Sequence, residues 1–179
     1  KKCLKRKNYL KNCIEPKEIL PKNNWFKNFE KIWSPSEENA LEELQNFIKN
    51  RIINYSDGRN FPNIIGTSKL SPFIKFGQIH VETIWSECTN PKNKTIGTSK
   101  FLAEIGWREF NHTLINNFSH MLKNNYSKKF DNFPWEKNSK FLSAWKKGLT
   151  GYPIVDAGMR ELYSTGWMHN RVRMIVGSF

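Results

Sequence analysis

Cysteine is scarce in this chain of 179 residues, and the three that occur form no pattern. Cys3, Cys13 and Cys88 are odd in number and include no C-x-x-C pair. This spacing excludes a disulfide framework and a cysteine zinc site, and it suits a reducing compartment. The four histidines are scattered without an HExxH motif, so we expect no metal site.

Long apolar runs are also missing, because no stretch approaches the roughly 18 uninterrupted apolar residues of a membrane span. The chain starts with Lys and Arg but has no apolar segment behind them, unlike a signal peptide. We therefore expect no membrane partner, and a monomer that is cytoplasmic in a bacterium or nuclear or organellar in a eukaryote. Because Phe179 falls within an apolar helical pattern and no initiator Met is present, we expect a longer parent protein.

Acidic residues are few, with 16 Asp and Glu against 29 Lys and Arg, a net charge of +13. This excess favours a polyanionic partner, although a composition biased toward Lys and Asn explains the lysines equally well. Arginine is more selective, since its planar guanidinium binds carboxylates and phosphates through two parallel hydrogen bonds. Five of the seven arginines lie within the motifs described below: Arg59, Arg108, Arg160, Arg171 and Arg173.

Helical periodicity without strand alternation predicts an all-α fold. Residues 1–33 lack periodicity and are interpreted as a linker. A first helix is expected after Ser34 as N-cap, with Pro35 at the first position and Glu37 completing a capping box. The other expected elements are a turn and loop over 55–66 and helices over 79–87, 98–123 and 139–147.

Three hydroxyls gather in Gly66-Thr-Ser-Lys-Leu-Ser71, just before an expected helix start. Free backbone N–H groups and the helix dipole favour phosphate there, although an ordinary N-cap also explains the hexamer. Tyr55 and Arg59 lie four residues apart upstream, and by themselves they are typical of a surface.

The block Phe101 to Phe110 carries Glu104, Trp107 and Arg108 at positions i, i+3 and i+4, which share one helix face. A carboxylate, an indole and a guanidinium together suit a planar, hydrogen-bonding ligand. The alternative is a Glu104–Arg108 pair that stabilises the helix beside a core Trp.

The final block, Thr150 to Phe179, includes Trp-Met-His-Asn170-Arg171-Val-Arg173. The two arginines are two positions apart, so they point about 200° apart on a helix. Asn170 beside them both donates and accepts hydrogen bonds. Asp156 and Arg160 are interpreted as an i, i+4 pair that holds the fold.

In this order the blocks resemble the DNA photolyase/cryptochrome family over residues 34–179, nearly residue for residue from Thr150 onward. The resemblance is closest to the class I cyclobutane pyrimidine dimer photolyases. It implies the first half of their helical FAD-binding domain, with residues 1–33 a linker or the tail of a missing α/β antenna domain.

The resemblance implies that Tyr55 contacts FAD and that Thr67, Ser68, Lys69, Leu70 and Ser71 hold its phosphates. Lys69 stands where relatives have Arg. Asn170 would stabilise the reduced form by facing the flavin N5, and Arg173 would face the flavin as well. Arg108 would lie near both cofactor and DNA.

On the DNA side, the resemblance implies that Arg59 and Arg171 contact backbone phosphates and that Asn170 lies at the lesion. It also implies that Glu104 hydrogen-bonds the damaged pyrimidine pair and that Trp107 stacks on this pair. Trp135 matches the outermost of three relay Trp residues, whose inner members would lie beyond Phe179. Phe101 stands where many relatives have Trp.

The implied activity is light-driven repair of cyclobutane pyrimidine dimers in DNA by electron transfer from reduced FAD, in a full-length carbon–carbon lyase. This fragment alone is expected to be inactive. The alternatives are a cryptochrome-like photoreceptor without repair and a basic helical nucleic-acid-binding module without cofactor. Asn170 and Glu104 favour repair over the photoreceptor function. The order of the sequence blocks argues against a nucleic-acid-binding module without cofactor.

Overall fold

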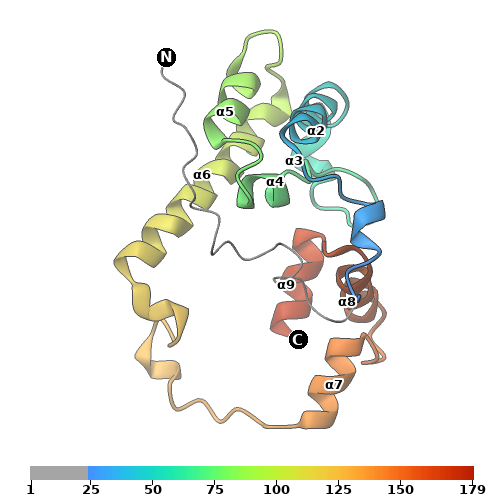
Figure 1. Cartoon of the computed structure of the whole chain (residues 1–179). Helices are drawn as coiled ribbons and strands as arrows, with labels where there is room; N and C mark the ends of the chain where they lie inside the picture. Colours follow the sequence, from blue (N-terminus) through green and yellow to red (C-terminus); the bar gives the residue numbers. More distant parts are fainter. Residues whose placement is uncertain (1–23) are drawn as a thin grey trace, which may run out of the picture.

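The computed structural model of the chain describes residues 24–179, and within that range it contains helices and no strand (Figure 1). The predicted all-α fold is therefore confirmed. The predicted linker falls mostly on residues 1–23, which lie outside the described residues.

The helices form two groups, which the chain joins through the long segment that follows α6 (Figure 1). The first group contains α2 (Glu37–Asn50), α3 (Tyr55–Gly58), α4 (Ser71–Lys75), α5 (Val81–Thr89) and α6 (Ile96–Asn117). The second contains α7 (Ser139–Lys147), α8 (Pro153–Thr165) and α9 (Asn170–Ser178). The 3-10 turn η2 (Phe29–Lys31) precedes α2, and three others lie between helices: η3 (Ile52–Asn54), η4 (Ser119–Leu122) and η5 (Lys128–Phe130).

The core of the first group lies where α2 and α6 meet η3 and α3. Ala40, Leu44 and Phe47 repeat at helical spacing on α2 and are fully buried. Phe101 of α6 packs on Phe47 with ring centroids 4.6 Å apart. This packing sets α6 beside the turn that follows α2, and so brings Glu104 close to the residues after Asn54.

Three helices have bounds that differ from the predicted ones. The N-cap of α2 is Ser36, whose hydroxyl accepts from the Asn39 amide at 3.0 Å, and neither Ser34 nor Pro35 opens the helix. The helix expected to reach Lys123 stops at Asn117, because the Phe118 backbone leaves the helical region at φ −124° and ψ 56°. The helix expected over 79–87 is shifted to Val81–Thr89.

The second group has its own core, which contains Val155, Met159, Met168, Val172 and Val176. The Trp145 indole covers this core, and its Nε1 donates to the Val176 carbonyl at 3.0 Å. The predicted end of α7 at Lys147 is confirmed, and Gly148 after it adopts a left-handed conformation with φ 62°.

Asp156 and Arg160 do stabilise the turn between α7 and α8, although the predicted pair between them is wrong. The Asp156 carboxylate accepts from the Thr150 hydroxyl at 2.7 Å and from the Thr150 and Gly151 amides. These hydrogen bonds, first of all the one from the Thr150 side chain, lower the pKa of Asp156. Arg160 donates instead to the Gly148 carbonyl at 2.8 Å.

Several contacts hold the two groups together. The Trp33 Nε1 donates to the Thr165 carbonyl at 2.7 Å. The Arg171 Nη2 donates to the Asn60 carboxamide oxygen at 2.6 Å. As a result, the start of α9 lies next to the segment that follows α3. No helix within the described range is long and apolar enough to cross a membrane.

Candidate active site

Tyr55 is the first site residue that the fold positions, and it lies buried at the start of α3. Its ring packs edge-on against Phe47 and Phe101, with centroids 5.5 and 5.3 Å away. Burial raises the pKa of the Tyr55 hydroxyl. The phenol therefore stays protonated at neutral pH and can both donate and accept a hydrogen bond.

A cavity of about 570 Å³ opens beside Tyr55. Its size lies within the range of about 300–1,000 Å³ that is typical of ligand sites. Three separate segments supply its wall: α3, the residues around the start of α4, and α6. The polar side chains on it include those of Tyr55, Ser68, Ser71, Glu104 and Arg108, and the apolar ones those of Ile74, Phe101 and Ile105.

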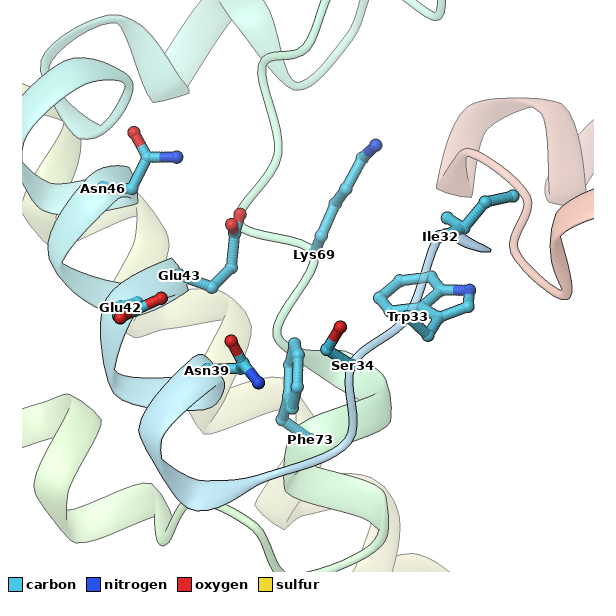
Figure 2. Close-up of a pocket in the computed structure, with 9 residues that line it drawn as sticks. All are labelled: Ile32, Trp33, Ser34, Asn39, Glu42, Glu43, Asn46, Lys69 and Phe73. Carbon is cyan, nitrogen blue, oxygen red and sulfur yellow. The ribbon is translucent and has the colours of Figure 1, made fainter. Parts of the chain in front are cut away.

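The hydroxyl-rich segment presents its side chains on two sides. Ser68 and Ser71 line the cavity, whereas Leu70 is buried in the first core. Lys69 has a left-handed backbone, with φ 54°, and its Nζ lies 5.3 Å from the centroid of the Trp167 ring. Lys69 faces a second cavity of about 500 Å³, across which Glu43 lies on α2 (Figure 2). The structure thus separates Lys69 from the two serines.

The Glu104 carboxylate forms ion pairs with Arg59 and, at 3.6 Å, with Lys100. The Arg59 guanidinium in turn lies 5.6 Å from the centroid of the Tyr55 ring. The alternative pair between Glu104 and Arg108 is not formed, because Arg108 pairs with Glu109. An acceptor and a cation thus meet at the edge of the cavity.

Trp107 lies beside a neighbouring cavity of about 320 Å³, and Glu104 and Arg108 line this cavity as well. The indole is 58% exposed, with its edge toward Phe110. Glu104 and Arg108 therefore stand between two adjoining spaces, and Trp107 borders only the second. A carboxylate in that position can bind a ligand in either one.

His169 caps α9 through Nδ1, which accepts from the Arg171 amide at 3.2 Å. The ring is buried, and its Nε2 has no partner within residues 24–179. Burial, followed by the charges of Arg171 and Arg59, lowers the pKa of His169, so the ring is neutral.

The residues after His169 point in different directions, as their helical spacing predicts. Arg171 donates to Asn60, whereas Arg173 donates to the Met168 carbonyl at 3.1 Å. Asn170 is exposed. Neither Asn170 nor Arg173 is among the residues that line the 570 Å³ cavity. Three of the four motif segments therefore share its wall, and the fourth contacts the segment after α3 through Arg171 and Asn60.

Trp135 lies on the surface, in the segment between α6 and α7. Its ring is 73% exposed and packs at an interplanar angle of 51° on Phe133. Among residues 24–179, no group of three or more His, Cys, Asp or Glu side chains is placed to hold a metal ion.

Comparison with known proteins identifies the family of this chain. A family model described as the FAD binding domain of DNA photolyase matches residues 101–179. A deoxyribodipyrimidine photo-lyase of Agrobacterium fabrum is 44% identical over 166 residues, which cover 90% of this chain and 34% of the relative. The chain belongs to the DNA photolyase family.

Two cryptochromes are also similar to this chain. Cryptochrome-2 of Arabidopsis thaliana is 38% identical over 161 residues, covering 83% of this chain and 26% of the relative. A cryptochrome structure from Synechocystis superposes with a TM-score of 0.80 at 30% identity, covering 92% of this chain and 35% of that one.

A photolyase structure from Agrobacterium tumefaciens superposes with a TM-score of 0.84 at 42% identity, covering 89% of this chain and 34% of that one. That protein is described as a bacterial class III photolyase, whereas the motifs alone placed the chain nearest to class I. The chain spans about a third of the length of the curated relatives that it matches.

The motifs did not point to Arg51, although it lies directly behind the Thr67–Ser71 segment. Its Nη1 donates to the Thr67 carbonyl at 3.2 Å. A signal was present, since Arg51 is one of only seven arginines in a chain that mostly uses Lys.

Proposed function

We propose that the protein carrying this chain repairs cyclobutane pyrimidine dimers in DNA with light and FAD. The observation that carries this proposal is the single cavity walled by Tyr55, Ser68, Ser71, Glu104 and Arg108. These residues come from segments far apart in the chain, and the family resemblance assigns each of the five to the cofactor or the lesion.

The cavity has the chemistry that FAD requires. Ser68 and Ser71 are hydroxyl donors for phosphate oxygens, and Arg108 adds a cation. Phe101, Ile74 and Ile105 give apolar surface for a flat ring. The Tyr55 hydroxyl, whose pKa is raised by burial, completes the donor set.

When bound in its reduced form, FAD supplies light-driven one-electron chemistry that splits the cyclobutane ring. The protein brings the damaged dinucleotide out of the duplex and holds it. Glu104 accepts hydrogen bonds from the pyrimidine pair, and Trp107 stacks against it in the adjoining cavity. Arg59 and Arg171 bind backbone phosphates, which fix register without sequence readout.

The remaining site residues have roles that follow the same proposal. Thr67, Lys69 and Leu70 belong to the phosphate segment through their backbone. Asn170 and Arg173 do not line the cavity, and their assigned places, Arg173 at the flavin and Asn170 at the flavin and the lesion, rest on the family resemblance. Trp135 is the exposed entry of an electron relay. Residues 34–179 form the first part of the FAD-binding domain, and residues 1–33 are the linker that precedes it.

A repair assay on the full-length protein tests the proposal. Ultraviolet-irradiated thymine oligonucleotides are incubated with the reduced flavoprotein in darkness or under blue light, and the dimers that remain are counted. We expect loss of dimers under light alone. Persistence of the dimers under light, with flavin bound and reduced, would rule out the repair function.

Arg171 gives a second expected result. Arg171→Ala removes one phosphate contact, so DNA affinity should fall and the slope of log K against log salt should decrease by about 1. Filter binding over a range of salt concentrations measures that slope. Lys49→Met, an exposed cation on α2, is the control and keeps the slope of the unmodified protein. An unchanged slope in the Arg171 variant would contradict the assigned contact.

A cryptochrome-like photoreceptor is the second candidate, because plant and cyanobacterial cryptochromes are among the similar proteins. The same assay separates the two functions. A photoreceptor would bind and photoreduce flavin yet leave every dimer intact.

A further inference from the structure

We propose that Arg51 is a positioning residue that fixes the phosphate-binding segment from behind, and so sets affinity for the phosphate-bearing part of FAD. This inference rests on the proposed function. Arg51 itself lies outside the cavity, at the C-terminal end of α2.

The contacts of Arg51 form a clamp between α2 and the segment. Its Nη2 pairs with the Glu43 carboxylate at 2.6 Å, and its Nη1 donates to the Thr67 carbonyl at 3.2 Å. The guanidinium lies 5.6 Å from the centroid of the buried Phe47 ring. With a side chain only 13% exposed, Arg51 is held in one geometry by an acid, a carbonyl and a ring.

The Thr67 carbonyl is the informative partner. A trans peptide unit is planar, so its C=O and N–H point in opposite directions. When Arg51 holds the Thr67 oxygen toward α2, the amide N–H of Ser68 in the same peptide unit points away from α2. Ser68 lines the cavity. By holding the Thr67–Ser68 peptide unit, Arg51 fixes the backbone from which Ser68 reaches the cavity.

The segment needs such support because its backbone is strained. Lys69 is the one residue other than glycine with positive φ in the described range, and this left-handed conformation is unfavourable for a residue with a Cβ. Residues in such conformations persist when their surroundings hold them. Leu70, buried in the core, anchors the segment after Lys69, and Arg51 anchors it before.

The clamp acts through geometry, since Glu43 neutralises the charge of Arg51. Loss of the clamp should therefore weaken the binding of ligands that carry phosphate and leave the binding of other ligands unchanged. Riboflavin has the ring system of FAD without the pyrophosphate, so it separates a clamp on the phosphate segment from general support of the fold.

The experiment titrates the apo form of the full-length protein with FAD and with riboflavin. For Arg51→Met we expect the Kd of FAD to rise about tenfold, the scale of one lost charge-assisted hydrogen bond, while the Kd of riboflavin stays within about twofold. The Kd of FAD for Arg51→Lys should lie between those of the unmodified protein and Arg51→Met, because one ammonium replaces a guanidinium that reaches two partners. Lys49→Met, two residues away on the same helix, should change neither value.

If the Kd values of FAD and riboflavin rise equally, or if neither rises, the role of Arg51 is overturned while the proposed function stays intact. Failure of the unmodified protein to bind FAD would overturn both. If Arg51→Met does not fold, Arg51→Lys and Glu43→Gln decide the matter by the same ratio of the two Kd values.

Discussion

Replacing Gly97 with alanine is expected to lower the free energy of unfolding by about 3 kcal/mol, the upper end of typical overpacking costs. A Cβ at this position would overlap the Ile52 carbonyl oxygen and lie 2.9 Å from its carbon and 3.2 Å from the Tyr55 Cβ. These neighbours belong to η3 and to the core, so α6 would have to move away from them. The same close approach sets Phe101 and Glu104 beside Tyr55.

Urea denaturation of the full-length variants measures the effect, and the same helix offers a matched control. Gly106 has no atom within 4 Å of an added Cβ, so Gly106→Ala should stabilise the protein by about 0.5–1 kcal/mol through helix propensity. Similar midpoints for the two variants would mean that α6 does not pack against η3 as described.

Glu104→Ala is expected to lower the quantum yield of dimer repair about tenfold while flavin occupancy stays intact, because a charged hydrogen bond to the lesion is lost. Glu104 lines both adjoining cavities, and its partner Arg59 remains to bind DNA. Repair per absorbed photon measures the loss, and the flavin absorbance of the purified variant measures occupancy.

The control for this variant is Glu82→Ala, which removes the same charge from a side chain that is 91% exposed on α5. Its yield and occupancy should match those of the unmodified protein. Loss of flavin from the Glu104 variant would instead make this residue part of the cofactor site, and an unchanged yield would remove it from the lesion site.

Much of the fold could be predicted because the deciding signals are local. The helix over 139–147 was predicted to the residue, since Asn138 caps its start and Gly148 ends it with positive φ. The start of α2 was missed because Ser34 and Ser36 compete as caps, and the hydroxyl of Ser36 meets the Asn39 amide. The end of α6 at Asn117 has no Gly or Pro to mark it.

The site was harder to predict wherever long-range partners decide the contacts. Glu104 and Arg108 have the spacing of a helix pair, yet Glu104 pairs with Arg59, 45 residues away. Arg51 likewise binds a carbonyl 16 residues further along. Spacing reveals which residues share a helix face, but it carries no information about which neighbouring element supplies the partner.

An experimental structure of the full-length protein with FAD tests the central claim most directly, namely that separate segments of this chain wall one flavin cavity. We predict FAD in the cavity that Tyr55 and Arg108 line, with its pyrophosphate against Ser68 and Ser71 and Glu104 free to face the lesion. Density for FAD at any other place, with this cavity filled by solvent, would contradict the account.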